Sequence, residues 1–180
     1  MRKQFCFYSW FWLLGGALLV SSPAKGIEGI SVGGQVGFVS LTDPPDVLYN
    51  NALGFGVDIG FRTNALVDLI FSFQRSSHGG SFPGLGSMTL YGQSVSADFH
   101  VGRAYDFDFT LGAGPGFYFF SSTLRTDTKF GINFGGAVDL LVDDHFKVGV
   151  GTRYYAIFGS TATSGSFWNV MMRFGYLFDT

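Results

Sequence analysis

Apolar residues recur at every second position along most of the chain after residue 28, and this period constrains the fold more than any other feature. The stretch 111–120, LGAGPGFYFF, carries apolar side chains at its odd positions and glycine at positions 112, 114 and 116. Successive side chains of a β-strand point to opposite faces, so this alternation predicts strands that each have one apolar face. No segment after residue 28 stands out as an amphipathic helix. The fold class is therefore predicted to be all-β.

Eight segments carry the alternation. Their apolar faces run over 30–38, 55–61, 67–73, 91–101, 107–119, 130–140, 146–158 and 168–178. Each segment is about ten residues long, close to the roughly 9–11 residues that a tilted strand needs to cross a bilayer. The lengths therefore favour strands that span a membrane.

The connections between these segments alternate in length. Three are tight, at 62–65, 102–106 and 142–145. Four are longer and rich in Gly, Ser, Pro and Thr, at 40–53, 75–87, 121–129 and 159–167. Short turns at one end and long loops at the other are typical of outer-membrane barrels.

The composition argues against a soluble surface. Charged residues make up 13% of the chain, against roughly 25% in an average soluble domain. A secreted β-sandwich or a lipocalin-like barrel is the alternative, but its second face would have to be charged and hydrated, and glycine tracks make a poor surface of that kind. The formal net charge of −2 gives no basic patch, so no nucleic-acid partner is expected.

The N-terminus has the pattern of a signal peptide. Arg2 and Lys3 precede a long uncharged stretch, and small residues follow around Ala24 and Gly26, either of which suits cleavage. We predict that 1–26 is removed and that 27–180 forms the barrel domain; a retained transmembrane anchor is the alternative. Cys6 is the single cysteine, so the mature chain would have no disulfide and no cysteine ligand.

Strands can cross a bilayer only as a closed barrel, because lipid cannot satisfy free backbone groups. When the strand directions are alternated, the outward aromatic residues gather near the two ends and the aliphatic residues lie between them, as two membrane interfaces require. The predicted membrane-interface aromatics are Phe38, Phe55, Phe61, Phe73, Tyr91, Phe99, Phe107, Phe117, Phe119, Phe146, Phe158, Trp168, Tyr176 and Phe178.

The pattern resembles the small eight-stranded outer-membrane β-barrel proteins, such as the membrane domain of OmpA and the OmpX and OmpW groups. The resemblance rests on GAGPGFYFF, on the strand–turn–strand unit INFGGAVDLLVDDHFKVGVGTRYY and on the last strand WNVMMRFGYLF. It implies an eight-stranded antiparallel up-and-down transmembrane β-barrel in the cell outer membrane. The partners it implies are outer-membrane lipid and lipopolysaccharide, with the barrel-assembly machinery during insertion, and we expect a monomer.

The inward positions hold the concentrated polar chemistry. Eight strands leave a lumen just wide enough to be filled by side chains, and isolated charges there would be costly, so they should be paired. We predict a plug of salt bridges; a gated polar pathway is the alternative. The predicted lumen ionic network is Asp58, Arg62, Asp68, Asp98, His100, Asp108, Asp139, Lys147, Arg153 and Arg173.

Catalytic and metal chemistry are not expected. Ser96, Asp98 and His100 share one strand face, but same-face neighbours lie about 6.6 Å apart, beyond the reach that a nucleophile and its base need. His78 is expected in a loop and His145 in a turn, neither with a partner. Three scattered histidines give no metal-ligand spacing, and we predict no metal and no cofactor.

The function predicted is therefore a structural, envelope or surface-interaction role, with no enzyme activity. A narrow channel for small or hydrophobic solutes is the first alternative, and a lipid-modifying barrel enzyme is the second. Pro115 cannot donate to a strand ladder, which predicts a bulge at that position.

Overall fold

The computed structural model describes residues 29–42, 46, 48–64, 66–123, 125–159, 161 and 164–179 of the 180-residue chain. The predicted signal peptide at 1–26 lies outside these residues. The strands are β1 (Gly29–Leu41), β2 (Ala52–Asn64), β3 (Val67–Gly79), β4 (Ser87–Ala104), β5 (Phe107–Ser122), β6 (Thr126–Leu141), β7 (Phe146–Ile157) and β8 (Phe167–Asp179).

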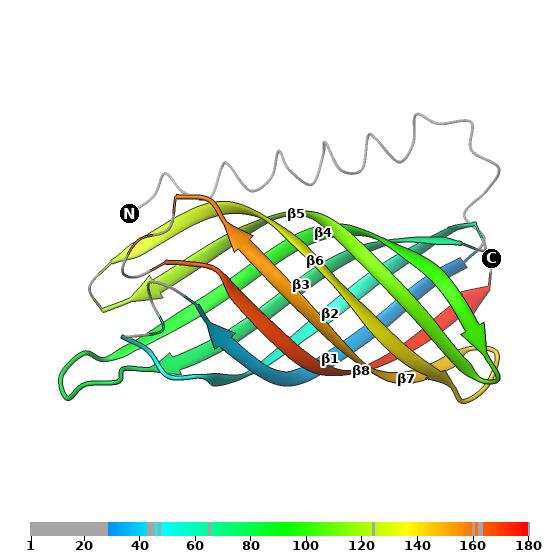
Figure 1. Cartoon of the computed structure of the whole chain (residues 1–180), viewed down its shortest axis with the longest axis horizontal. Helices are drawn as coiled ribbons and strands as arrows, with labels where there is room; N and C mark the ends of the chain where they lie inside the picture. Colours follow the sequence, from blue (N-terminus) through cyan, green and yellow to red (C-terminus); the bar gives the residue numbers. More distant parts are fainter. Residues whose placement is uncertain are drawn as a thin grey trace.

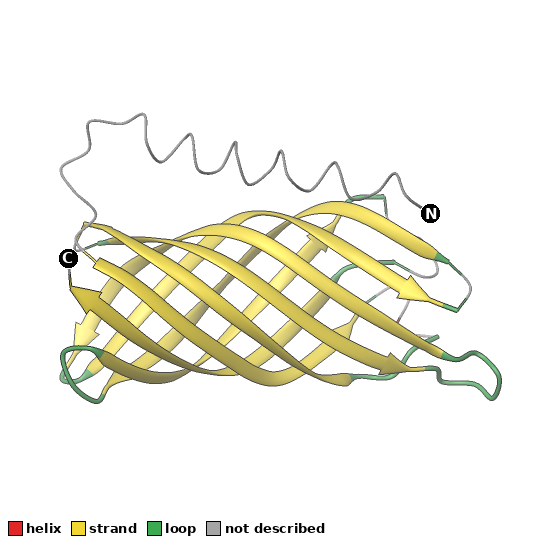
Figure 2. Ribbon diagram, turned by 180° about the vertical axis from the view of Figure 1, so that it is seen from behind, coloured by secondary structure: helices red, strands yellow, loops and turns green. Residues whose placement is uncertain are grey.

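The strands form one closed antiparallel barrel (Figures 1 and 2). Each strand pairs with the next along the chain, and β8 pairs with β1 from Gly29 opposite Asp179 to Leu41 opposite Phe167. This last pairing leaves no open sheet edge. β1 begins and β8 ends at the same end of the barrel, together with the tight turns, which we call the turn end; the opposite end is the loop end (Figure 1). The predicted fold class is confirmed.

No helix among the described residues has the length and apolar character needed to cross a membrane.

Seven of the eight strands are longer than the segments read from the sequence, up to 18 residues in β4, because antiparallel pairing continues past the alternating apolar stretch. β7 has 12 residues and ends at Ile157, one residue before its predicted segment does. The connection predicted as a long loop at 121–129 is in fact short: β5 ends at Ser122 and β6 begins at Thr126. The backbone N–H of Ser122 donates to the carbonyl of Arg125 across it, at 2.9 Å.

The turn end is tied together by backbone hydrogen bonds between hairpins. Each tight turn accepts one bond from the next hairpin along the wall: His100 N–H to the carbonyl of Leu66, Leu141 N–H to Asp106, and Leu177 N–H to His145, at 2.9, 2.8 and 2.7 Å. These bonds continue the ladder beyond the paired strands.

The turn between β6 and β7 is held by one carboxylate. Asp143 Oδ1 accepts the backbone N–H groups of His145 and Phe146, at 2.7 and 2.6 Å. These two bonds favour the charged carboxylate and hold the pKa of Asp143 below its usual value.

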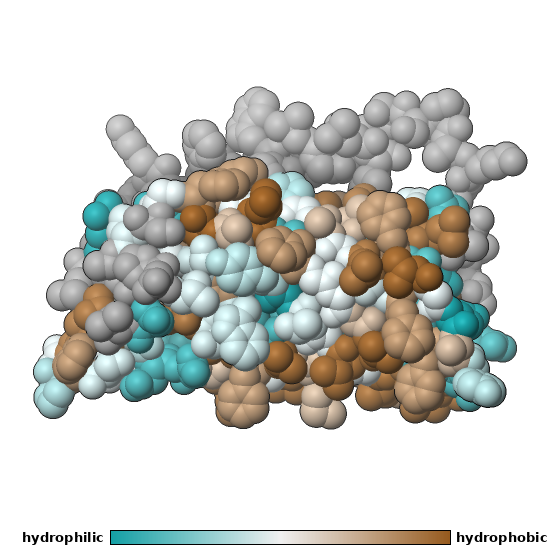
Figure 3. Space-filling model, viewed as in Figure 1, coloured by the Kyte–Doolittle hydropathy of each residue, from teal (hydrophilic) through white to brown (hydrophobic). Residues whose placement is uncertain are grey.

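The outward wall is apolar. Nine of the predicted interface aromatics are exposed, from Trp168 at 40% to Phe38 at 64%, and Phe61, Phe73, Phe117, Phe119 and Phe146 are half-buried. Figure 3 shows brown and tan side chains along the wall, interspersed with pale ones, and most of the teal side chains toward the two ends. Contact of these aromatics with a membrane interface stays a prediction.

The inward glycines make room for large side chains from neighbouring strands and from their own strand. A Cβ atom on Gly112 would meet the carboxylate of Asp98, and one on Gly149 would meet that of Asp139. A Cβ atom on Gly116 would meet the hydroxyl of Tyr118. The glycine face of 111–120 is therefore occupied by side chains.

No bulge forms at Pro115, so that expectation is wrong. Ser94 opposes Gly116 and Ala97 opposes Ala113, with the same register on both sides of the proline. The β4–β5 register shifts instead between His100 and Gly102. The strand keeps its pairing with β6, where Pro115 opposes Ile132.

Replacement of Gly114 tests the close approach of β4 and β5. A Cβ atom there would overlap the backbone carbonyl of Val95, so we expect Gly114→Ala to lower the free energy of unfolding by about 1–3 kcal/mol. Gly102 has open space where its Cβ would lie, which makes Gly102→Ala the matched control. The measurement is the urea midpoint in lipid vesicles, and equal midpoints for the two variants would contradict the packing described.

Candidate functional site in the barrel lumen

The lumen is filled by two layers of different chemistry. Charged side chains occupy the middle and the turn end, and apolar side chains occupy the loop end. The sequence predicted the first layer and missed the second.

Arg153 is the centre of the charged layer. Its Nη2 lies 2.8 and 2.9 Å from the two carboxylate oxygens of Asp98, and its Nη1 donates to Ser96 Oγ and Asn133 Oδ1, at 2.7 and 2.8 Å. The two charged side chains are 15% and 5% exposed. Hydrogen bonds between a guanidinium and a carboxylate are among the strong charge-assisted contacts. The pair joins β4 to β7 across the lumen.

His100 links two carboxylates nearer the turn end. Its Nδ1 lies 2.7 Å from Asp108 Oδ2, and its Nε2 lies 3.1 Å from Asp68 Oδ2. Arg62 Nε lies 3.2 Å from the other oxygen of Asp68. This chain of contacts connects β2, β3, β4 and β5.

Asp139 is paired more loosely. It is 1% exposed, with Lys147 Nζ at 3.4 Å and Arg173 Nη2 at 4.0 Å from its Oδ2. Neither carboxylate oxygen accepts a hydrogen bond from another residue that the structure describes.

Asp58 differs from the prediction, which placed it in an ion pair. No cation among the described residues lies within ion-pair distance of it, and the amide of Gln35 donates to its Oδ1 at 3.1 Å. A cavity of about 30 Å³ lies between Asp58, Arg153 and Arg173. That volume holds about two water molecules, which is far from an open pore.

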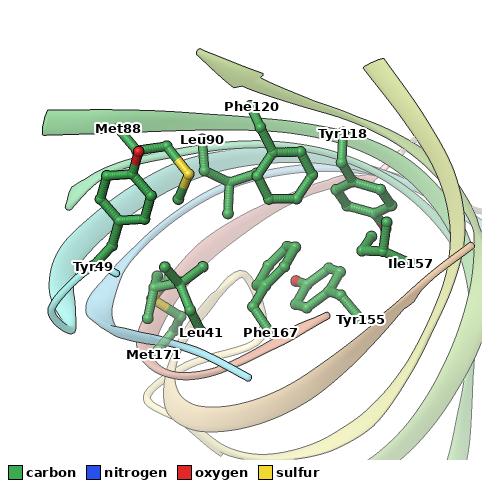
Figure 4. Packing of buried hydrophobic residues seen from close by; sticks show 11 residues of the cluster. Leu41, Tyr49, Met88, Leu90, Tyr118, Phe120, Tyr155, Ile157, Phe167 and Met171 are labelled. Atoms are coloured by element: carbon green, nitrogen blue, oxygen red, sulfur yellow. The ribbon is translucent and has the colours of Figure 1, made fainter. Parts of the chain in front are cut away.

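The loop end is closed by an apolar cluster (Figure 4). Tyr155 stacks on Phe167 with ring centroids 4.3 Å apart, and Tyr118 meets both rings edge-on at 5.6 Å. The members are 0–6% exposed: Val39, Leu41, Tyr49, Met88, Leu90, Tyr118, Phe120, Tyr155, Ile157, Phe167 and Met171. The lumen was predicted to be plugged by charged pairs. That prediction describes the middle and the turn end, but not the apolar loop end.

The signal for this cluster was present in the sequence. Tyr118 and Phe120 take the same set of alternate positions as the glycines at 112, 114 and 116. The inward face therefore changes from small to large along one strand. A polar trio joins the layers, because Asn169 Nδ2 donates to Gln74 Oε1 and to Tyr155 Oη, at 3.2 and 3.1 Å.

Same-face neighbours on one strand do reach each other. Ser96 Oγ donates to Asp98 Oδ1 at 2.9 Å, so the expectation that such pairs are too far apart is wrong. Their side chains lean along the strand and shorten the separation. His100 contacts Asp68 and Asp108, so the three residues form no triad.

His78 lies on β3 and has partners, contrary to the expectation of an unpartnered loop residue. Its Nδ1 lies 2.8 Å from the carbonyl of Asn50 and must donate to it, so Nε2 accepts the hydroxyl of Ser76 at 2.8 Å. This orientation is the one that a hydroxyl nucleophile and its base adopt. Both side chains are buried inside the lumen, at 3% and 0% exposure. His145 also has a partner, since its ring stacks on Tyr176.

Within the described ranges, no three His, Cys, Asp or Glu side chains are placed to hold a metal ion together.

Known structures share this architecture. OprG from Pseudomonas aeruginosa superposes with a TM-score of 0.67 and 12% identity, over 87% of this chain and 99% of that one. Neisserial surface protein A gives 0.63 and 16%, over 84% and 97%. The N-terminal β-barrel domain of Pseudomonas aeruginosa OprF gives 0.59 and 14%, over 86% and 100%. The predicted resemblance to small outer-membrane barrels is confirmed for the fold.

No protein-family model and no curated protein sequence matches the chain.

Removal of the Arg153 charge tests the charged layer. We expect Arg153→Met to lower the free energy of unfolding by about 3–5 kcal/mol, because Asp98 is left buried and unpaired. Arg125 also pairs with an aspartate, but its side chain is 62% exposed, so Arg125→Met should cost less than about 1 kcal/mol.

A double variant tests whether the unpaired Asp98 charge causes the loss of stability. Combining Arg153→Met with Asp98→Leu removes both charges, and most of the lost stability should return. The free energy of unfolding by denaturant is measured for the wild type, Arg153→Met, Asp98→Leu and the double variant. A double variant no more stable than Arg153→Met would contradict an uncompensated Asp98 charge as the cause.

Proposed function

We propose that the protein is an integral barrel of the outer membrane whose sealed wall serves as an anchor, with a structural or surface-interaction role carried by its loop end. The observation that carries this proposal is the double closure of the lumen. The aromatic cluster blocks the loop end, and the Arg153–Asp98 layer blocks the middle.

The apolar wall supports a membrane location. Thirty large hydrophobic side chains are exposed among the described residues, most of them on the outward face of the barrel. Soluble monomers rarely expose apolar patches larger than a few hundred Å². The alternative of a secreted sandwich would leave this surface in water.

The fold supports the same location by analogy. OprG is named as an outer membrane protein, and Neisserial surface protein A is named as a surface protein. In barrels of this kind the short turns face the periplasm and the longer loops face outward. We therefore place the loop end at the cell surface.

The loops are arranged to present an ordered surface. Tyr49 forms a bridge with Gly80, and Ser81 N–H donates to the carbonyl of Leu48 at 2.8 Å, so the β1–β2 and β3–β4 connections hold each other. On the other side, Ser164 Oγ donates to Asp127 Oδ2 at 3.3 Å. A pre-organised surface binds a partner at lower entropic cost than a flexible one.

A narrow channel is the second candidate. The observation that favours it is the partial exposure of the Arg62 and Lys147 side chains, 27% and 23%, at the turn end of the lumen. Water reaches the charged layer from that side. Conduction would still require the apolar cluster to move aside.

A lipid-modifying activity has less support. The Ser76–His78 pair has a suitable hydrogen bond, but a buried pair inside the lumen gives a lipid substrate no approach. We expect no enzyme activity.

Electrophoresis of an isolated outer-membrane fraction tests the location. A folded barrel resists mild detergent, so the unboiled protein should migrate differently from the boiled protein. Recovery of the chain in a soluble fraction, with no heat-dependent shift, would contradict the proposal.

Conductance in planar bilayers separates the anchor from the channel. We expect no resolved current steps from the wild-type protein, because both layers are closed. Phe120→Ala combined with Phe167→Ala opens the apolar cluster and should raise the frequency of current steps. Phe158→Ala is the control, since Phe158 is 54% exposed and lies outside the cluster. Steady current steps from the wild-type protein would contradict the sealed anchor and favour the channel.

A further inference from the structure

One cationic side chain, that of Arg75, lies between two aromatic rings on the outer wall. Arg75 lies on β3 with an exposed side chain, and its cross-strand neighbours are Phe55 on β2 and Tyr91 on β4. Its guanidinium carbon lies 6.0 Å from the Phe55 ring centroid and 5.5 Å from that of Tyr91. Both rings are themselves exposed, at 57% and 42%.

Arg75 has no counter-charge among the residues that the structure describes. No carboxylate of the described residues lies within ion-pair distance of Arg75. The other two described cations of the loop end are occupied: Arg125 pairs with Asp127 at 2.7 Å, and Lys129 donates to the carbonyl of Gly159 at 2.6 Å. An exposed guanidinium with five N–H donors is therefore available to an external anion.

The neighbours along the strand place Arg75 at a boundary. On the same outward face of β3, Phe73 comes two residues earlier and Ser77 two residues later, with Thr89 opposite Ser77. The wall thus changes from apolar to hydroxyl-bearing at Arg75. On the placement proposed above, that boundary faces the headgroups of the outer leaflet.

We propose that Arg75, between Phe55 and Tyr91, binds the phosphate of a lipid A headgroup in the outer leaflet. The guanidinium fork matches two phosphate oxygens, and the flanking rings hold it by cation–π contact. The hydroxyls of Ser77 and Thr89 lie on the side from which sugar or phosphate oxygens would approach. This inference rests on the proposed outer-membrane location and names the lipid group that the wall recognises.

Lipid retention by the refolded protein tests the site. Wild type and variants are placed in phosphatidylcholine vesicles that contain either bis-phosphorylated lipid A or the same lipid without phosphates, and retained lipid is counted by native mass spectrometry. For Arg75→Gln we expect the half-saturating concentration of phosphorylated lipid A to rise about ten-fold, the loss of one charge-assisted contact. Arg75→Lys should recover part of it, since it keeps the charge without the fork.

Arg125→Gln is the matched control, because it removes the same charge at the same end of the barrel. It should leave retention of phosphorylated lipid A unchanged, and no variant should alter retention of the dephosphorylated lipid. Equal retention by wild type and Arg75→Gln, or an equal loss in Arg125→Gln, would overturn the site.

The heat-dependent shift on the same samples separates the two proposals. Inserted, shift-positive protein that retains lipid A regardless of Arg75 refutes this inference alone. Protein that neither inserts nor shifts refutes the membrane location, and this inference with it.

Discussion

The pairing of β1 with β8 closes the barrel, and both the wall and the filled lumen require that closure. This pairing runs the full length of both strands and turns a meander of hairpins into a closed wall. A closed wall has no sheet edge, so its backbone groups are satisfied whatever solvent lies outside. It also divides the side chains into two sets with different requirements, because alternate residues face either the outside or a lumen too narrow for bulk water.

In the charged layer of the lumen, three aspartates lie opposite glycines of the neighbouring strand. Asp58 opposes Gly33, Asp98 opposes Gly112, and Asp139 opposes Gly149. The carboxylates of Asp98 and Asp139 occupy the space that a Cβ atom on the opposing glycine would need. Glycines on neighbouring strands therefore provide space for the charged layer. At the loop end, large residues replace glycine on the inward face and the cluster around Tyr155 and Phe167 takes over. The two layers together make the sealed anchor the function that this geometry supports best.

Much of this could be predicted from the sequence, because a period of two assigns each side chain to a face. The eight strands, the outward aromatic residues and the inward charges all follow from it. Pair partners do not, because they depend on register and on the stagger of the closed barrel. That is why Asp58 contacts Gln35 and His100 joins two aspartates, pairings that no local pattern contains. The strand ends were also missed, since pairing past the apolar stretch leaves no hydropathy signal.

In this structure alternate residues of one strand face either the outside, which we assign to lipid, or a lumen closed to bulk water. Single spin labels along β8 test this assignment most directly, at Val170, Met172 and Phe174, which are 38%, 60% and 52% exposed, and at Asn169 and Met171, which are 2% and 1% exposed. In lipid vesicles, collisions with dissolved oxygen should be frequent at the first three positions and rare at the other two, with a period of two. Uniform access to a water-soluble relaxation agent at all five positions would contradict the account.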